Sequence, residues 1–447
     1  MQDKKPRISF FGLGYVGIVT AACFASKGFK VLAYDIDESK VNLLNEGKTI
    51  IYEPYLDDLV RYSVKNGFLK ASVDPNEVVL NSEITFITVG TPSKQDGSID
   101  LRFVKDAANL IGKALKSKNS WHLVVVKSTV LPGTTNNVVK VTIEEISGRK
   151  GEYDFGLCSN PEFLREGSAV QDMLYPDRLI IGGSKKSTDY LLNFYKMFYE
   201  KLPETIITSA ENAELIKYAN NAFLAMKVSF INMIARICQK LPNSDVEIVA
   251  KGIGLDKRIG PLFLKAGVGW GGSCWPKDLN ALKNFAEEIK VDVPLINATI
   301  KVNEEQPLIA IEYAKEILGN LKDRKISILG LSFKPNTDDI REAVSIKIIN
   351  KLLDEGASVV VYDPKAMEGI RRIFGNKLVY AKDAIDCIKN SECAILVTEW
   401  DEFKKLKPED FLNNMKYPAL IDGRRVYDPE IYSSKLNFRA VGLGYRN

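Results

Sequence analysis

Short apolar runs alternate with helical segments through the first 200 residues of the chain. The runs that read as buried strands are 7–11, 30–34, 84–88, 123–127, 155–159 and 179–182. Helical patterns lie between these strands, which is typical of a parallel sheet covered on both faces. The pattern therefore predicts a doubly wound α/β domain over residues 1–205.

A long apolar segment follows this first domain. Residues 208–241 predict one helix that Thr208 and Glu211 open as a capping box and that Pro242 ends. With the shorter helices after it, this segment forms a helical middle domain over residues 206–310. Its apolar helices exceed what one small domain can bury, and this excess indicates a subunit interface.

The alternation of strand and helix returns after residue 320. The runs 325–334, 358–363 and 393–398 repeat the pattern of the first domain, with fewer glycines in the first turn. The fold class is therefore predicted as α/β. Two Rossmann-like doubly wound domains, 1–205 and 311–447, are joined by the long central helix and the helical middle domain.

A glycine-rich turn follows the first strand and opens the first helix. Gly12 is expected to make the turn, Gly14 to admit a pyrophosphate, and Gly17 to pack helix on strand. Asp35 stands at the end of the next strand, where its carboxylate would accept hydrogen bonds from a ribose 2′-OH and repel a 2′-phosphate. The spacing predicts a dinucleotide site that prefers NAD to NADP, and the alternative is a tight turn that binds nothing.

The segment from Gly267 to Asp278 has the layout of an activated nucleophile. Cys274 follows a run of glycines and stands at the start of a predicted helix, where free N–H groups and the helix dipole favour a thiolate. Lys217 and Asn221 are four residues apart on one face of the long helix. The alternatives are a buried structural thiol and a solvated Lys–Asn pair.

Composition narrows the classes of function. The chain has 447 residues, 45% hydrophobic and 26% charged, and a net charge of +4 without a basic tail, so we expect a soluble protein that binds no nucleic acid. Its six cysteines form no C-x-x-C pair, which indicates free thiols in the cytoplasm and no zinc site. The single histidine, His122, reads as a strand-start residue, so no His-based mechanism or metal site is expected. We expect no membrane segment.

Seven motifs, in this order, resemble the nucleotide-sugar dehydrogenases of the UDP-glucose/GDP-mannose dehydrogenase family: GLGYVG, KSTVLPGTT, SNPEFLREG, ELIKYANNAF, RIGPLFLKAGVGWGGSCWPKD, LSFKPNTDDIRE and DGRRVYD. The resemblance covers almost the whole chain. It implies a homodimer that uses NAD and converts C6 of a nucleotide sugar, most closely UDP-glucose, to a carboxylate. Trp275 departs from the Phe that the family has after its cysteine.

The resemblance also implies roles for individual residues. The catalytic residues would be Cys274, Lys217, Asn221, Asp278, Glu162 and Thr129. Residues at the cofactor would be Gly12, Gly14, Tyr15, Val16, Gly17, Asp35, Lys40, Gly90, Thr91, Thr129, Glu166, Lys277 and Arg341. Residues at the substrate would be Glu162, Phe163, Leu164, Lys217, Asn221, Arg258, Phe263, Lys265, Gly271, Lys334 and Arg424, with Arg258 reaching into the neighbouring subunit.

The chemistry suits these residue types. A thiolate can hold the aldehyde as a thiohemiacetal, which gives up a second hydride and becomes a thioester. Lys217 and Asn221 can stabilise the oxyanion, and Asp278 or Glu162 can position the hydrolytic water. The alternatives are a GDP-mannose or UDP-N-acetylhexosamine dehydrogenase, a two-electron hydroxyacid or sugar-phosphate dehydrogenase that does not need Cys274, and a non-catalytic NAD-binding regulator.

Overall fold

The computed structural model describes residues 5–445 of the chain, which divides into two compact units. Unit 1 comprises Met1–Asn220 and Asn280–Phe285, and unit 2 comprises Asn221–Leu279 and Ala286–Asn447. The boundary crosses two helices, α9 (Ala210–Gln239) and α11 (Trp275–Glu288). The division into three domains that the sequence pattern suggests stays a prediction.

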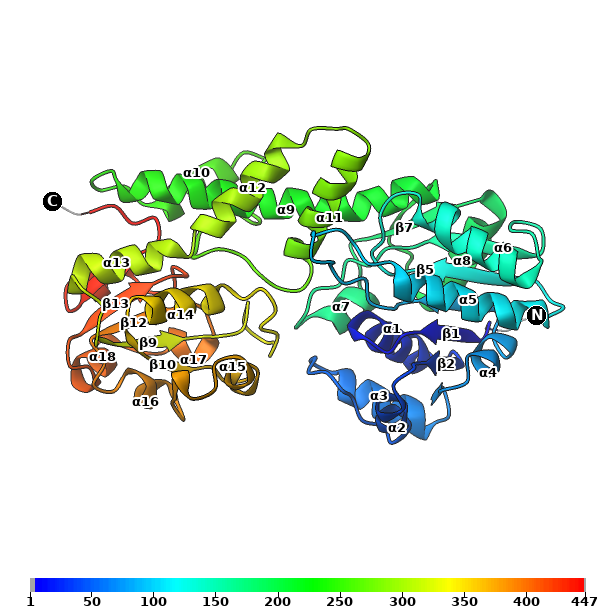
Figure 1. The fold of residues 1–447 in the computed structure, drawn as a ribbon, viewed down its shortest axis with the longest axis horizontal. Coiled ribbons are helices and arrows are strands. Elements are labelled where there is room, and N and C mark those ends of the chain that lie inside the picture. Colours follow the sequence, from blue (N-terminus) through cyan, green and yellow to red (C-terminus); the bar gives the residue numbers. More distant parts are fainter. Residues whose placement is uncertain (1–4, 446–447) are drawn as a thin grey trace. The chain divides into compact units, whose positions relative to one another are not determined.

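Unit 1 is built on a sheet that, within the described residues, has eight strands in the order β3-β2-β1-β4-β5-β6-β7-β8 (Figure 1). The strands are β1 (Ile8–Phe11), β2 (Val31–Tyr34), β3 (Leu69–Ser72), β4 (Ile84–Ile87), β5 (His122–Val126), β6 (Phe155–Ser159), β7 (Arg178–Gly183) and β8 (Glu204–Thr208). The six strands predicted for this region are all present within one or two residues. His122 is the first residue of β5, as predicted.

Two features of this sheet differ from the sequence prediction. The sheet is not wholly parallel, because β7 runs antiparallel to β6 through the pairs Cys158–Gly183 and Ser159–Gly182. In addition, β3 and β8 were not predicted. They are the two edge strands, and their side chains are partly exposed, so neither carries the continuous apolar run that marks the central strands.

Helices cover both faces of the sheet (Figure 1). One face packs on α1 (Tyr15–Ser26), α3 (Leu56–Lys65), α7 (Ala169–Leu174) and α8 (Lys185–Phe198). The other packs on α4 (Pro75–Leu80), α5 (Arg102–Lys116) and α6 (Val141–Ser147), which follows the π-helical turn η1 (Thr135–Lys140). A further helix, α2 (Glu38–Asn45), follows β2. Alternate side chains of each strand enter opposite layers; Phe10 faces the first and Phe11 the second.

Helix α9 begins later than predicted. Thr208 ends β8, and Ser209 caps the helix by accepting a hydrogen bond from Asn212 N at 3.2 Å, so the predicted Thr208–Glu211 capping box is wrong. The helix ends at Gln239, before the predicted stop at Pro242. Among the described residues it is the one helix long and apolar enough to pass the length and hydropathy test for a membrane span, a test that core helices of soluble proteins also pass.

Unit 2 contains a parallel sheet whose described strands follow the order β11-β10-β9-β12-β13-β14 (Figure 1). The strands are β9 (Lys325–Leu329), β10 (Ser358–Tyr362), β11 (Val379–Tyr380), β12 (Cys393–Leu396), β13 (Ala419–Asp422) and β14 (Asn437–Ala440). Its helices are α10 (Val246–Gly254), α12 (Pro294–Glu305), α13 (Leu308–Leu318), α14 (Val344–Asp354), α15 (Met367–Phe374), α16 (Ala384–Ile388), α17 (Asp401–Lys404), α18 (Pro408–Asn414) and α19 (Pro429–Ser433). Helices α13, α14 and α15 pack on one face and α16 to α19 on the other, so the second doubly wound sheet is confirmed.

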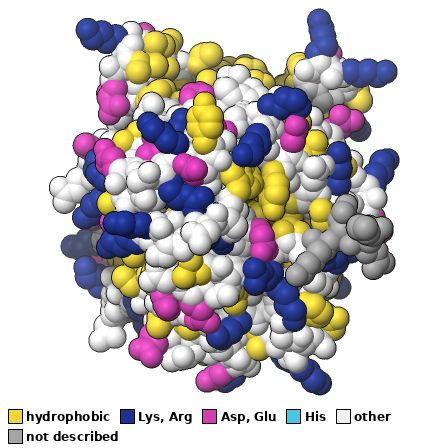
Figure 2. All heavy atoms as spheres, turned by 90° about the vertical axis from the view of Figure 1, so that its right-hand side faces the viewer, with side chains coloured by type: hydrophobic (Ala, Val, Ile, Leu, Met, Phe, Trp, Pro, Cys, Tyr) yellow, Lys and Arg dark blue, Asp and Glu magenta, His cyan; other side chains and the backbone are white. Residues whose placement is uncertain are grey.

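The charged surface is mixed in sign. On the face shown in Figure 2, Lys and Arg side chains are interspersed with Asp and Glu. Exposed pairs such as Lys185–Asp189, at 2.8 Å, are typical. Exposed ion pairs of this kind contribute about 0–1 kcal/mol each to the free energy of unfolding, so they do not determine the fold.

Glu214 fastens α9 to the sheet of unit 1 through the loop that follows β5. Its carboxylate accepts hydrogen bonds from Gly133 N at 2.6 Å and Thr135 N at 2.8 Å. Burial raises the pKa of Glu214 to about 7, although both N–H donors oppose that shift. When a carboxyl has a higher pKa in the folded protein than in the unfolded chain, the free energy of unfolding falls as pH rises. The fall occurs between the pKa of the unfolded state and the pKa of the folded state.

We expect Glu214→Gln to remove this pH dependence. Relative to the variant, the wild-type protein should lose on the order of 3 kcal/mol in its free energy of unfolding between pH 4.5 and pH 8. Urea unfolding of both proteins across this range measures the difference. Glu211→Gln is the control, because a hydrogen bond from Asn136 lowers the pKa of Glu211 and its contribution is constant above pH 5. A constant difference between wild type and Glu214→Gln would contradict the prediction.

Candidate functional site

The turn between β1 and α1 has the predicted geometry. Gly12 has a φ of +102°, which L side chains rarely adopt. A Cβ on Gly17 would lie 2.0 Å from Gly12 O, so a glycine is required where α1 meets the strand. A Cβ on Gly14 would meet no atom within 4 Å, and Tyr15 and Val16 then open the helix. The turn therefore leaves open space above Gly14, where a ligand can approach the backbone.

Asp35 is fixed to this turn. Its Oδ2 accepts a hydrogen bond from Leu13 N at 2.7 Å, and its Oδ1 accepts one from Asp37 N at 3.0 Å. Lys40 Nζ lies 3.9 Å from Oδ2. The carboxylate is mostly buried and is held at the carboxyl end of β2, beside the glycine turn, as the sequence predicted.

The second sheet repeats this contact with a different outcome. Asp363 Oδ2 accepts a hydrogen bond from Leu331 N at 2.7 Å, which matches the Asp35–Leu13 contact. It also accepts hydrogen bonds from Ser332 N at 3.1 Å and from Trp400 Nε1 at 3.0 Å. Asp363 is 1% exposed, so protein donors satisfy it and it is not available to a ribose. The two domains share this contact in the turn, but in the second domain Ser332 and Trp400 also donate to the aspartate.

Glu53 links two segments that the sequence predicts for the cofactor site, and sequence reasoning missed this link. Its buried carboxylate accepts a short hydrogen bond from Tyr15 OH and bonds of 2.7 Å from Gly167 N and Ala169 N. It thereby ties the first turn of α1 to the loop that carries the half-buried Glu166. A separation of 114 residues between Glu53 and Gly167 leaves no local pattern that could have revealed this link.

The loops after β4 and β5 meet at the carboxyl ends of those strands. Thr91 Oγ1 donates to Thr129 O at 2.9 Å, and Ser128 Oγ donates to Val89 O at 2.7 Å. Thr129 is half-buried and Gly90 is exposed, with open space where a Cβ would stand. The predicted residues Gly90, Thr91 and Thr129 therefore share one edge of the sheet, where open α/β sheets bind ligands.

Glu162 and Lys217 form a buried ion pair in unit 1. Lys217 Nζ lies 3.0 Å from Glu162 Oε1, and the two side chains are 5% and 8% exposed. The other carboxylate oxygen accepts a hydrogen bond from Leu164 N. The Phe163 ring has Lys217 Nζ at 5.3 Å and the Arg178 guanidinium at 3.9 Å from its centroid. The sequence-predicted residues 162–164 and Lys217 are thus in one cluster.

Asp278 is the centre of a second buried cluster, in unit 2. The side chain is 1% exposed. Asn221 Nδ2 donates to its Oδ2 at 2.7 Å, and Lys277 Nζ donates to its Oδ1 at 2.6 Å. Both carboxylate oxygens are therefore oriented by side chains that the sequence had placed in the site. Lys217 and Asn221 belong to the same continuous helix, one turn apart.

Cys274 stands directly before α11, as predicted. The helix starts at Trp275, and its first turn closes with a hydrogen bond of 2.8 Å from Asp278 N to Cys274 O. Ser273 Oγ lies 3.5 Å from Cys274 Sγ. Among the described cysteines Cys274 is exposed, whereas the other five are buried. Solvent and reagents therefore have access to one thiol.

Buried amides fix the loop that precedes Cys274. Asn232 Oδ1 accepts a hydrogen bond from Gly267 N at 2.9 Å, and Gln306 Nε2 donates to Gly267 O at 2.7 Å. Asn303 pairs with both backbone groups of Trp270, accepting from its N at 2.8 Å and donating to its O at 2.9 Å. These three amides were not predicted; Asn232 is on α9, Asn303 is on α12, and Gln306 directly follows α12. They hold residues 267–270 in one conformation.

Arg424 also holds the loop 267–270 in place through a hydrogen bond to its backbone. Its Nη1 donates to Gly269 O at 3.0 Å, and its Nε donates to Val397 O at 2.6 Å, directly after β12. A Cβ on Gly271 would lie 2.1 Å from Glu342 O, so the loop backbone packs closely on a neighbouring segment of unit 2. Lys265 is exposed at the start of the loop, and the Phe263 ring lies 5.9 Å from the Trp275 ring.

The remaining predicted cations are Arg258, Arg341 and Lys334, and the backbone O of Arg341 accepts a hydrogen bond from Gly272 N at 3.0 Å, in the loop before Cys274. Arg258 pairs with Asp256 at 2.6 Å, and Arg341 pairs with Asp339 at 2.6 Å, both on exposed loops. Lys334 Nζ lies 5.5 Å from the centre of the Phe333 ring. A carboxylate two residues away orients each arginine, so these contacts are local and identify no ligand.

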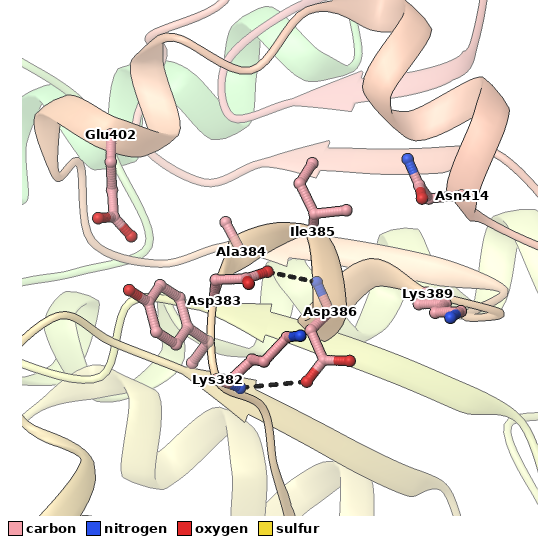
Figure 3. A pocket seen from close by; sticks show the side chains of 9 residues that line it. Lys382, Asp383, Ala384, Ile385, Asp386, Lys389, Glu402 and Asn414 are labelled. Atoms are coloured by element: carbon pink, nitrogen blue, oxygen red, sulfur yellow. Dashed lines mark hydrogen bonds between the residues drawn. The ribbon is translucent and has the colours of Figure 1, made fainter.

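A cavity of about 410 Å³ opens elsewhere in unit 2 (Figure 3). Its lining residues are Tyr362, Lys382, Asp383, Ala384, Ile385, Asp386, Lys389, Glu402 and Asn414. Asp383 caps α16 by accepting from Asp386 N at 2.7 Å, and Asp386 in turn accepts from Lys382 N at 3.1 Å. Asp383 and Asp386 therefore stabilise the start of α16, and none of the residues predicted for the site lines this cavity.

Family models match three successive parts of the chain. Residues 6–202 match the NAD binding domain of the UDP-glucose/GDP-mannose dehydrogenase family, residues 211–305 its central domain, and residues 327–429 its UDP binding domain. The first match contains the glycine turn and the Glu162 loop. The second contains Lys217, Asn221, Cys274 and Asp278.

Relatives with known names match over nearly the whole chain. The chain is 42% identical to the UDP-glucose 6-dehydrogenase TuaD of Bacillus subtilis, over 95% of this chain and 90% of that one. It is 43% identical to the UDP-glucose 6-dehydrogenase AglM of Haloferax volcanii, over 94% and 96%. A solved UDP-glucose dehydrogenase from Pyrobaculum islandicum superposes with a TM-score of 0.92 at 38% identity and covers 99% of each chain. The chain belongs to the UDP-glucose/GDP-mannose dehydrogenase family and is an NAD-dependent oxidoreductase.

Proposed function

We propose that this enzyme oxidises the C6 alcohol of UDP-glucose to the carboxylate of UDP-glucuronate through a covalent intermediate on Cys274. The observations that carry the proposal are two polar clusters, the buried Glu162–Lys217 pair in unit 1 and the groups around buried Asp278 in unit 2, together with an exposed thiol directly before α11. The names of the relatives supply the nucleotide and the sugar.

The residues of the first turn fit NAD. Open space above Gly14 and Gly90 allows a close approach of backbone to ligand, and Asp35 is held where a ribose hydroxyl would meet it. Tyr15, Val16, Lys40, Thr91, Glu166, Lys277 and Arg341 complete the proposed cofactor set. Bound NAD supplies the hydride acceptor for each of the two oxidations.

Cys274 is proposed to hold the reacting carbon between those oxidations. Its thiolate adds to the aldehyde to give a thiohemiacetal, which loses a hydride and becomes a thioester that water then hydrolyses. Lys217 and Asn221 are one helical turn apart, and both can donate a hydrogen bond to the developing oxyanion. Thr129 and either Glu162 or Asp278 position the water, because the single histidine, His122, is buried in β5 and a carboxylate can take the role of the base.

The nucleotide sugar is proposed to bind against the clamped loop 265–271. A loop already fixed by Asn303 and Arg424 loses little conformational freedom when it binds a ligand. Lys334 and Arg424 are the proposed diphosphate and nucleotide contacts, with Phe163, Leu164, Phe263, Lys265 and Arg258 around the sugar and base. In this proposal residues 1–205 hold NAD, 206–310 carry the catalytic helix, and 311–447 hold the nucleotide.

The substrate assignment is tested with a panel of nucleotide sugars and a count of NADH. We expect two NADH per UDP-glucose. We also expect kcat/KM for GDP-mannose and for UDP-N-acetylglucosamine to be at least about tenfold lower than kcat/KM for UDP-glucose. One NADH per sugar would indicate a two-electron dehydrogenase. A preference for GDP-mannose or a UDP-N-acetylhexosamine would keep the chemistry and change the substrate.

Replacing Cys274 by Ser should lower the rate of UDP-glucuronate formation by at least about 1000-fold, because a hydroxyl is far less ionised than a thiol and its ester hydrolyses more slowly. Product analysis and the intact mass of the protein after mixing with substrate and NAD measure this. Cys238→Ser is the matched control, because Cys238 is buried in the core of unit 2. Near-normal acid formation by Cys274→Ser would show that the thiol is structural.

We further propose that the enzyme is a cytoplasmic homodimer without a membrane segment. Helix α9 exposes an apolar stripe in unit 2, with Phe223, Phe230, Met233 and Ile237 each 41% or more exposed. Their spacing of three, four and seven residues places them on one face. A second copy of the chain can bury this face, and α9 also carries buried, hydrogen-bonded Glu214 and Lys217, which suit a protein interior and not lipid.

The dimer should dissociate when a charge is placed in this stripe. We expect the wild-type protein to sediment as a pair of chains in detergent-free buffer and Phe230→Asp to shift toward the single chain. Phe103→Asp is the control, because Phe103 is 49% exposed on α5, outside the stripe. Equal sedimentation of both variants as dimers would place the interface on another surface.

A further inference from the structure

Glu53 joins two segments of the proposed cofactor site, although it does not belong to the proposed cofactor set. Its side chain is buried between α2 and α3, with 5% of the residue exposed. Its Oε2 accepts hydrogen bonds from Tyr15 OH and from Gly167 N at 2.7 Å, and its Oε1 accepts one from Ala169 N at 2.7 Å. All four residues lie in unit 1. Three donors from two separate segments therefore meet on one carboxylate.

The first of these segments is the start of α1, where Tyr15 is the first helical residue. The helix begins with a hydrogen bond of 3.0 Å from Ile18 N to Gly14 O, and the first N–H groups of a helix have no partner within it. These N–H groups belong to the turn that leaves open space above Gly14. Burial and then the hydrogen bond to Glu53 raise the pKa of Tyr15, so its hydroxyl stays a donor at neutral pH. Glu53 therefore fixes the helix start through a side chain and does not use its backbone N–H groups.

The second segment is the loop between β6 and α7. Gly167 has a φ of +82°, and Ala169 is the first residue of α7, which Ser168 does not cap with its side chain. Glu53 takes the place of that cap from 116 residues away. Glu166, a member of the proposed cofactor set, is half-buried directly before Gly167. The Glu53 carboxylate thus fixes the backbone next to Glu166 relative to the start of α1.

We propose that Glu53 is a positioning residue for NAD, which holds the first turn of α1 and the loop around Glu166 at a fixed separation before the cofactor binds. The inference rests on the proposed function, in which Tyr15 and Glu166 lie at NAD. A site whose two sides are already fixed loses less conformational freedom on binding, so it binds more tightly. Without the carboxylate, three donors lose their common acceptor and the two segments lose their link.

The link should affect the cofactor more than the sugar. Glu162, at the other end of the same loop, has a partner of its own, because Lys217 Nζ lies 3.0 Å from its Oε1. That pair does not depend on Glu53, so the proposed substrate residues stay in place when Glu53 is changed. A general loss of structure would instead weaken the binding of both ligands.

Calorimetric titration with NADH, without any sugar, tests the inference on wild type, Glu53→Gln and Glu392→Gln. Glutamine keeps the size of glutamate, but its Nε2 is a donor and cannot accept from the groups that face it. We expect Glu53→Gln to raise the Kd of NADH at least about tenfold. Glu392 is the matched control in unit 2: it is 7% exposed and accepts from Lys325 N at 3.2 Å and Arg324 Nη1 at 2.9 Å. Glu392→Gln should lower the urea midpoint and leave the Kd of NADH within about twofold of wild type.

Steady-state kinetics of Glu53→Gln should show the same separation. We expect the KM of NAD to rise while the KM of UDP-glucose stays within about twofold of wild type. An equal rise in both KM values would overturn the inference. An unchanged Kd of NADH in a variant that is only less stable would also overturn it and make Glu53 structural.

Tyr15→Phe removes one donor and leaves the bonds from Gly167 and Ala169 to Glu53 in place. We expect it to raise the Kd of NADH by roughly threefold, and the double variant to bind NADH no more weakly than Glu53→Gln alone. Effects that multiply in the double variant would overturn the link between the two residues. If Glu53→Gln does not fold, Tyr15→Phe decides, and an unchanged Kd of NADH would then overturn the inference.

A wild-type enzyme that binds NADH and oxidises no UDP-glucose would contradict the proposed function. The titrations without sugar would still decide whether Glu53 positions the cofactor site.

Discussion

The pair formed by Glu162 and Lys217 imposes the strongest constraint on unit 1. Two ions removed from water lose several kcal/mol of hydration each, and a pair recovers this only if its geometry is fixed. The geometry here depends on three separate elements: the loop after β6 presents Glu162, α9 presents Lys217, and Glu214 fastens α9 to the loop after β5. The ordered loops at this edge of the sheet follow from that requirement.

The two doubly wound sheets show how one turn can serve different purposes. In both, an aspartate at the end of the second strand accepts the N–H of a leucine in the first turn at 2.7 Å. In the first domain the turn that Asp35 contacts leaves open space above Gly14. In the second domain, the indole N–H of Trp400 donates to Asp363 Oδ2, the same oxygen that accepts from Leu331 N. The shared contact stabilises the turn, and the residues around it decide whether a dinucleotide can bind.

The parts of the fold that could be predicted are those with short-range signals. The turn at Gly12 and Gly17, the central strands and the place of Cys274 before a helix all follow from residues within one motif. Edge strands β3 and β8 lack an apolar run, and Ser209 displaced Thr208 as the cap because β8 extends to Thr208. Glu53 was missed because its partners are not close in sequence: Tyr15 is 38 residues away, and Gly167 and Ala169 are 114 and 116 residues away.

The residues outside the motifs show why a site cannot be reduced to its reactive groups. Asn303 accepts a hydrogen bond from the N–H of Trp270 and donates one to its C=O. This pair of hydrogen bonds permits one orientation of the Trp270 backbone. Replacement of this amide by a group of similar size without both donor and acceptor would leave a buried backbone group unpaired, at a cost of about 1–3 kcal/mol. Helix α12 therefore fixes the loop before any ligand arrives. The glycines that make the loop flexible in the unfolded chain allow its backbone to reach these amides, and the amides then remove that flexibility in the folded protein.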